Sequence, residues 1–402
     1  MKTPSPSATT IVRRAAVTAL AAALTAAAAT TGAAAAEPDR PELHQAMQAF
    51  IDAGFTGVQL RVNDERGEWA ASAGVRKLGQ AAKPPTNGRF WTGSVIKPFT
   101  ATLVLQLAAE GKIGLDAPVA HYLPGYGLDR RITTRMLLQH TSGLFNYTGE
   151  YYDDGTFAPG IPATGDTWFT NRFRTYQPEE LVRLALSKPA RFEPGTGQKY
   201  SNTNYTLALL LIEKVSGRSY AEELQRRILR PLGMRSTLVP GKRTQMPGPY
   251  AHAYYRIQEA GRWKTVDISR QNLSLLAGAG DLISTTEDLH TFFSALNDGR
   301  LLPPGLLAEM RVPYGELGYG LGLFAQDLGS GCGTVYQHNG SPPHGYGTLM
   351  YSSPDGKTTL TGSVTWVDSQ TRGPAKDFQK LLDGLVKQVF CTDRPTASKS
   401  AQ

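Results

Sequence analysis

Three short motifs, each present once in the chain, supply side chains that can carry out acyl transfer: Ser94-Val95-Ile96-Lys97, Tyr200-Ser201-Asn202 and His338-Asn339-Gly340. A serine hydroxyl is a nucleophile, a lysine amine can activate it, and a tyrosine phenol can relay a proton. The third motif adds a histidine and a glycine that suits a strand edge. Together these groups favour acyl transfer through a covalent serine ester.

The segment around Ser94 is expected to form a helix. An apolar run over residues 95–110 stops at Gly111, which is typical of a buried helix with a glycine cap. Ser94 is a favoured N-cap residue, and Lys97 lies one turn further along the same face. The helix N-terminus also offers N–H groups to a developing oxyanion. An ordinary capping serine followed by a surface lysine gives the same pattern, so this motif alone does not decide the chemistry.

The second and third motifs lie at expected junctions between elements. A turn rich in Gly and Pro, residues 193–197, precedes Tyr200, and a helix is expected over residues 205–215. Residues 333–340 indicate a strand that ends at a glycine. Taken singly, these patterns also fit a polar turn and a strand end with a surface histidine. The order of all three motifs along the chain is what favours a shared site.

In this order the motifs resemble those of the penicillin-recognising serine hydrolases, whose elements include S-x-x-K and K-T-G. One branch of that family holds class C β-lactamases, serine D-Ala-D-Ala carboxypeptidases, D-aminopeptidases and esterases. In that branch Tyr-x-Asn is the second motif, and His-x-Gly can be the third. The likeness covers residues 40–392 and is nearest to the secreted DD-carboxypeptidase/transpeptidases. Further segments match the family: Gln139–Leu144, Pro194-Gly195, Pro231–Met234 and Gly318–Gly322.

The resemblance implies a role for each motif residue. Ser94 would attack a carbonyl carbon, and Lys97 and Tyr200 would take and relay its proton. The backbone N–H groups of Ser94 and Ser341 would form the oxyanion hole. Neither a metal nor an organic cofactor is expected.

The remaining motif residues are expected to bind substrate or support the others. Asn202 would orient Lys97 and the substrate amide, and His338 would be a hydrogen-bonding neighbour of the tyrosine. Asn339 and Gly340 would line the substrate-binding strand edge. His344, a few residues further on, is expected to be an exposed loop histidine rather than part of the cleft.

The substrate is less well determined than the chemistry. In the carboxypeptidase likeness, an arginine and two threonines bind the C-terminal carboxylate of the substrate. Here Phe324 stands at or near the place of the arginine, and Asn339 and Ser341 replace the threonines. The primary interpretation is a D-Ala-D-Ala carboxypeptidase/transpeptidase acting on peptidoglycan-type D-peptides. The alternatives are a D-aminopeptidase or esterase, a class C-like β-lactamase, and a non-catalytic penicillin-binding receptor, which the three intact motifs disfavour.

Composition narrows the compartment and the partners. Residues 1–36 have a basic start, an alanine-rich stretch and small residues before the expected cleavage site, which predicts a signal peptide and a secreted protein. No later stretch approaches the ~20 apolar residues of a membrane span, so no stable membrane anchor is expected. The net charge is +8, but the basic residues are not concentrated in one stretch of the sequence, so nucleic acid is not expected as a partner. We expect a monomer, with its two cysteines, Cys332 and Cys391, paired in a disulfide.

Strand patterns at both chain ends predict an α/β (α+β) fold. Two hairpins, at 57–73 and 347–364, together with the strand before His338, indicate an antiparallel sheet of about five strands. The family resemblance supplies the topology, in which helices flank this sheet and a mostly helical region is inserted, as in β-lactamases and transpeptidases. The predicted organisation is a discontinuous sheet domain (37–125 and 275–392), a mostly helical domain (126–274) and a disordered tail (393–402).

Overall fold

The computed structural model describes residues 39–152, 154–369 and 375–391, together with Met1. Apart from Met1, the predicted signal peptide lies outside the described residues, as does the predicted tail. The helices are α1 (Pro41–Asp52), α2 (Ile96–Ala109), α3 (Val119–Tyr122), α4 (Thr134–Leu138), α5 (Gly165–Asn171), α6 (Pro178–Leu186), α7 (Asn202–Ser216), α8 (Tyr220–Leu224), α9 (Thr286–Asn297), α10 (Pro304–Arg311) and α11 (Ala375–Phe390). The strands are β1 (Gly57–Asp64), β2 (Gly67–Gly74), β3 (Phe90–Trp91), β4 (Glu150–Tyr151), β5 (Phe157–Ala158), β6 (Tyr254–Glu259), β7 (Arg262–Asp267), β8 (Ile283–Ser284), β9 (Phe324–Asp327), β10 (Thr334–Gln337), β11 (Tyr346–Ser352), β12 (Thr359–Thr365) and β13 (Val367–Asp368).

The main sheet is antiparallel and joins both ends of the chain, as predicted. Within the described residues it has six strands rather than about five, in the order β2-β1-β12-β11-β10-β9. The N-terminal hairpin meets the C-terminal one where β1 pairs with β12, with Gly57 opposite Thr365. The short strand β9 adds the sixth position by pairing with β10 at the sheet edge.

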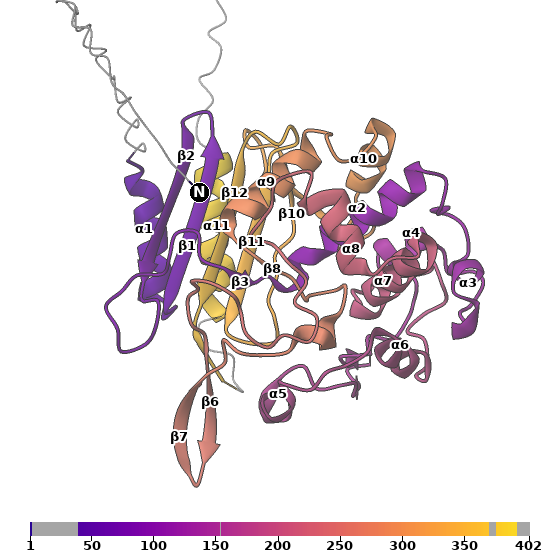
Figure 1. Cartoon of the computed structure of the whole chain (residues 1–402), viewed down its shortest axis with the longest axis horizontal. Coiled ribbons are helices and arrows are strands. Elements are labelled where there is room, and N and C mark those ends of the chain that lie inside the picture. The colour runs from indigo at the N-terminus through magenta and orange to yellow at the C-terminus, as the bar shows by residue number, and fades with distance from the viewer. Residues whose placement is uncertain (2–38, 153, 370–374, 392–402) are drawn as a thin grey trace, which may run out of the picture. The chain divides into compact units, whose positions relative to one another are not determined.

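Alternating side chains explain why both faces of this sheet are covered. Along β1, Val58, Leu60 and Val62 belong to a buried cluster with residues of α1 and α11. The alternate residues of these strands face the opposite side of the sheet. One of them is Thr361 of β12, whose hydroxyl donates to the carbonyl of Thr286 at the start of α9. This two-residue period is the one a pleated strand imposes. Figure 1 shows α1 and α11 beside the sheet, with α2, α4, α6, α7 and α8 gathered on the side of the larger core.

Two local features differ from the sequence-based expectations. Ser94 is not an N-cap: it lies inside a 3₁₀ turn, Gly93–Val95, which leads into α2 and has no side-chain cap bond. The region expected to be poor in strands contains the β6–β7 hairpin, which projects from the rest of the fold in Figure 1. Most of its side chains are exposed, so it lacks the apolar alternation that marks a half-buried strand in sequence.

Candidate active site

Lys97 is fully buried one turn after Ser94, and its side-chain nitrogen has three polar neighbours. Nζ lies 3.0 Å from Ser94 Oγ, 3.0 Å from Asn202 Oδ1 and 2.7 Å from the carbonyl oxygen of Ala279. Burial lowers the pKa of Lys97 well below its usual value, because the interior disfavours the charged amine. The first motif therefore contains a buried amine in contact with a serine hydroxyl.

The second motif approaches from the start of α7. Asn202 is the first residue of this helix, and its backbone N–H donates to Asn146 Oδ1 at 3.2 Å. This bond holds the backbone of Asn202 in place beside Lys97. The Tyr200 ring centroid lies 4.7 Å from Lys97 Nζ. Burial raises the pKa of the Tyr200 phenol, and its hydrogen bond with Ser94 acts in the opposite direction. Below it, the buried His140 ring lies 4.3 Å from the Tyr200 ring, centroid to centroid.

The third motif continues β10 beyond its last regular residue. His338 is buried; its Nδ1 donates to the carbonyl of Asn339 at 2.7 Å, and the Tyr319 hydroxyl donates to its Nε2 at 3.1 Å. Burial lowers the pKa of His338 to about 3, and the nearby Lys97 has a smaller effect in the same direction. The imidazole is therefore neutral at physiological pH, and the surface histidine that the sequence pattern alone allows is excluded.

Gly340 brings the third motif into contact with the first. A Cβ atom at this position would lie 2.1 Å from the Thr92 carbonyl oxygen and 2.9 Å from the Ser94 nitrogen. From the other side, a Cβ on Gly93 would lie 2.6 Å from the Ser341 nitrogen. Both glycines are therefore needed for the backbone at Ser341 to approach the backbone at Ser94.

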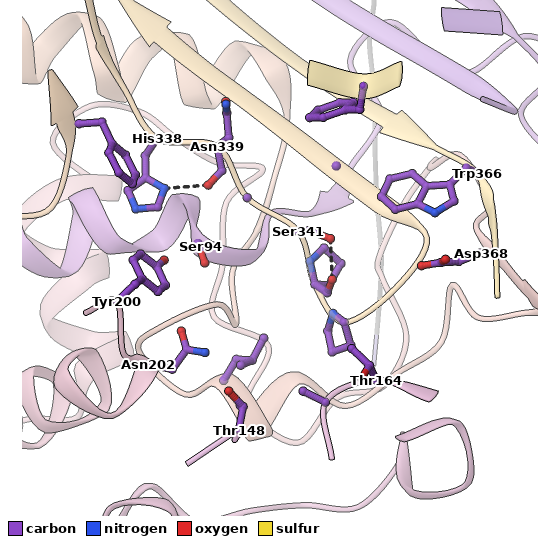
Figure 2. Close-up of a pocket in the computed structure, with 18 of the residues that line it drawn as sticks. Ser94, Thr148, Thr164, Tyr200, Asn202, His338, Asn339, Ser341, Trp366 and Asp368 are labelled. Atoms are coloured by element: carbon purple, nitrogen blue, oxygen red, sulfur yellow. Dashed lines mark hydrogen bonds between the residues drawn. The ribbon is translucent and has the colours of Figure 1, made fainter. Parts of the chain in front are cut away.

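A cavity of about 550 Å³ opens beside these motifs. Figure 2 shows Ser94, Tyr200 and Asn202 on one side of it and Trp366 and Asp368 on the far side. Phe324, Asn339 and Ser341, three of the residues predicted to bind substrate, also line it. Most of the remaining wall is apolar and comes from Phe55, Ala163, Leu276, Pro342, Pro343 and Phe378. Among the described residues that line the cavity, there is no arginine and no lysine.

His344 is buried, which corrects the expectation of an exposed loop histidine. Its exposed fraction is 2%; Nδ1 donates to Asp368 Oδ2 at 2.7 Å, and Nε2 accepts from the Gly165 N–H at 3.2 Å. Its ring also packs against Trp168 at 4.5 Å, centroid to centroid. Local composition was misleading because these partners come from segments distant in sequence.

Sequence reasoning missed several residues that support the site. They are Asn146, Tyr319, Ala279, the neutral His140 beside Tyr200, and the buried acid Asp281. None belongs to one of the three motifs, and Ala279 acts through its backbone. The described residues contain no group of three or more His, Cys, Asp or Glu side chains placed to hold a metal, and no helix among them is long and apolar enough to cross a membrane.

Comparison with known proteins places this geometry in a family. The sequence profile described as Beta-lactamase matches residues 34–384. The chain belongs to the Beta-lactamase family. It is thus related to β-lactamases and penicillin-binding proteins, as the order of the motifs predicted.

The relatives of this member of the Beta-lactamase family differ in their stated activities. A D-stereospecific amidohydrolase from a Streptomyces species is 35% identical, with 89% of this chain and 100% of that chain covered and a TM-score of 0.75. Penicillin-binding protein 4* of Bacillus subtilis is 30% identical over 72% of this chain, and the match spans 63% of that protein's length. D-amino acid amidase from Ochrobactrum anthropi, at 24% identity and a TM-score of 0.72, shares the fold over 86% of this chain and 97% of its own.

Proposed function

We propose that this protein hydrolyses amide bonds on the carboxyl side of D-amino acid residues through an acyl-enzyme on Ser94. The observation that carries the proposal is the cavity wall: it is largely apolar, and its described residues include no cation that could bind a substrate carboxylate. By the family resemblance, Phe324 stands at or near the place of the carboxylate-binding arginine. The likeness to the D-stereospecific amidohydrolase supports the same substrate class.

The contacts of Lys97 suit a neutral amine that acts as a base. A neutral amine has two N–H donors and one lone pair. The carbonyl of Ala279 and Oδ1 of Asn202 accept the two N–H bonds, which leaves the lone pair to accept the Ser94 hydroxyl proton. Because burial lowers the pKa of Lys97, this neutral form exists at a much lower pH than for a lysine in water.

The reaction consists of acylation of Ser94 followed by hydrolysis of the acyl-enzyme. Ser94 Oγ bonds to the substrate carbonyl carbon as its proton moves to Lys97 Nζ, and the oxyanion accepts from the N–H groups of Ser94 and Ser341. When the C–N bond breaks, Tyr200 passes a proton to the leaving amine and regains one from Lys97. A water molecule then attacks the ester by the reverse path, which releases the acid and restores the serine.

A substrate panel tests this function. We expect higher kcat/KM for D-phenylalanine amide than for L-phenylalanine amide, and no advantage for an acylated D-Ala-D-Ala peptide over its C-terminal amide. Ser94→Ala should abolish turnover and keep the wild-type melting temperature, since Ser94 makes no cap bond. Comparable rates for both amide enantiomers, or wild-type turnover in Ser94→Ala, would contradict the proposal.

A D-Ala-D-Ala carboxypeptidase/transpeptidase is the second candidate, because the motifs resemble that branch of the family and the chain is 30% identical to a penicillin-binding protein. A strong preference for the free-acid peptide over its amide would select it. If a fluorescent penicillin labels Ser94 covalently and the label is released slowly, the protein is a penicillin-binding enzyme. Rapid release of the label would indicate a β-lactamase. Failure of both penicillin and a fluorophosphonate to label Ser94 would select a non-catalytic receptor.

A further inference from the structure

Asp281 is a buried acid that the steps above do not use. It lies just before β8, and only 5% of its surface is exposed. Its Oδ1 accepts from the Gly278 N–H at 2.8 Å. Among the described residues, no lysine, arginine or histidine nitrogen forms an ion pair with it within 4.0 Å. A buried carboxyl group is costly unless its surroundings compensate for it, so this placement calls for a reason.

The hydrogen bond of Asp281 closes a tight turn that presents a carbonyl to Lys97. The turn runs from Gly278 to Asp281, and the carbonyl of Ala279 within it accepts from Lys97 Nζ at 2.7 Å. The Gly278 carbonyl is also held, because Thr100 Oγ1 donates to it at 3.0 Å. A Cβ on Gly278 would lie 2.7 Å from the Leu209 Cβ, so the turn is packed directly against α7.

Asp281 also acts on Lys97 through its charge. The carboxylate raises the pKa of Lys97 against the larger, lowering effect of burial. In the reverse direction, burial raises the pKa of Asp281 to about 7, which backbone hydrogen bonds and the charge of Lys97 partly oppose. The other titratable groups around this pair are uncharged at neutral pH: His140, Tyr147, Tyr200, Tyr205, Tyr220 and His338.

We propose that Asp281 is a positioning residue for Lys97: its carboxyl closes the turn that holds the lysine amine, and its negative charge favours the protonated form of that amine. The inference rests on the proposed function in that Lys97 is taken as the base for Ser94. It adds a residue outside the three motifs. Because the two groups are coupled, their protons are taken up by the pair rather than by either residue alone.

Direct titration of Lys97 tests this independently of any substrate. Protein labelled with ¹³C at lysine Cε is titrated by NMR, and Lys97→Met assigns the signal. In Asp281→Asn, which keeps an oxygen acceptor for the Gly278 N–H, we expect the Lys97 midpoint to fall by about one pH unit. The wild-type signal should show a second inflection near pH 7 that the variant lacks.

Asp288→Asn is the matched control, because Asp288 is also a buried acid but bonds instead to Ser236 and Thr237. It should leave the Lys97 midpoint in place. An unchanged midpoint in Asp281→Asn would overturn the charge role, whether or not the protein has the proposed activity. A shifted midpoint in a protein that hydrolyses none of the D-amino acid amides would uphold the pair and reject the proposed function instead.

Kinetics separate the charge of Asp281 from its part in the turn. In Asp281→Asn the acidic limb of kcat/KM should move to lower pH with the plateau kept. In Asp281→Ala the plateau itself should drop about tenfold, because the Ala279 carbonyl is no longer held. Equal plateaus in the two variants, at equal melting temperatures, would show that the turn does not need the side chain.

Discussion

Under the proposed function, Phe324 limits how much a free carboxylate contributes to substrate binding. Its ring lines the cavity and packs at 4.5 Å from the Tyr319 ring and 5.4 Å from the His338 ring, centroid to centroid. An aromatic side chain here offers apolar contact and no charged hydrogen bond. A guanidinium would instead form two charge-assisted bonds to a carboxylate, which are the strong ones.

We therefore expect Phe324→Arg to change selectivity toward free carboxylates. The ratio of kcat/KM for an acylated D-Ala-D-Ala peptide to that for its C-terminal amide should rise about tenfold to a hundredfold, the equivalent of roughly 2 kcal/mol. Phe324→Leu is the control, because it removes the ring without adding charge, and its ratio should stay near that of the wild type. If the arginine variant keeps the wild-type ratio, the carboxyl end of the substrate does not approach residue 324.

At the scale of elements, the site depends on how closely the end of β10 approaches the turn before α2. Gly340 exchanges hydrogen bonds with Thr348 of β11, so the main sheet holds its backbone in place. The space that a Cβ would fill is occupied by backbone atoms of Thr92, Ser94 and Val95, none of which can rotate away. Any side chain at this position must therefore push the strand away from the serine.

Gly340→Ala should consequently lower activity more than its size suggests. A shift of about 1 Å between the strand and Ser94 is expected to reduce kcat/KM about a hundredfold, and overpacking should cost roughly 1–3 kcal/mol of stability. Gly305→Ala, in α10 with no atom within 4 Å of the added Cβ, is the matched control. Wild-type kcat/KM in Gly340→Ala would show that the approach of strand to turn is not needed for catalysis.

At the scale of the whole molecule, the C-terminal helix is attached to the sheet in two ways. Leu382, Leu385 and Val386 of α11 pack in the cluster that contains α1 and β1. Cys391, just after α11, forms a disulfide with Cys332 in the loop between β9 and β10, across a sequence separation of 59 residues. This pairing agrees with the prediction from the two cysteines.

Removal of the disulfide should destabilise the fold without disabling the chemistry. For a closed loop of this length the chain-entropy argument gives about 4 kcal/mol. The double variant Cys332→Ser/Cys391→Ser should therefore unfold at a lower denaturant midpoint and retain wild-type kcat/KM at low temperature. An unchanged midpoint, measured beside the oxidised wild type, would count against a stabilising disulfide.

Buried histidines should make the molecule sensitive to acid. His290 lies in α9 and its ring Nδ1 forms a hydrogen bond with the hydroxyl of Thr359 in β12. Burial lowers the pKa of His290 to about 4. Between pH 6.5 and 4 the unfolded chain therefore takes up a proton at this residue that the folded chain does not, so stability falls as the pH falls. Asp281, with its pKa raised to about 7, acts in the opposite direction across this range, because there the folded chain takes up a proton at this residue more readily than the unfolded chain does.

The variant His290→Gln isolates the contribution of this histidine. Relative to wild type, its free energy of unfolding should improve on acidification by at most about 1.4 kcal/mol per pH unit. Denaturant titrations at pH 6.5, 5.5 and 4.5 measure the difference. Parallel pH profiles for the two proteins would exclude His290 as a source of acid sensitivity.

The sequence by itself determined the family, the mixed fold and the residues around Ser94. Motifs and strand patterns depend on residues close together in the chain, so spacing and periodicity identified them. The family resemblance also put Phe324 at or near the place of a carboxylate-binding arginine, and this correspondence stays a prediction. The division into sheet and helical domains, the signal peptide and the catalytic roles stay predictions.

Only the tertiary structure decided the environment of those residues. Ala279 meets Lys97 through a backbone carbonyl, and no residue pattern marks such a contact. His344 is buried because Asp368 and Gly165 converge on it from distant segments. Burial lowers the pKa of both Lys97 and His338, and that burial depends on how α2, α7 and the sheet pack together. Spacing in the sequence selects which groups can react, whereas packing sets their contacts and protonation states.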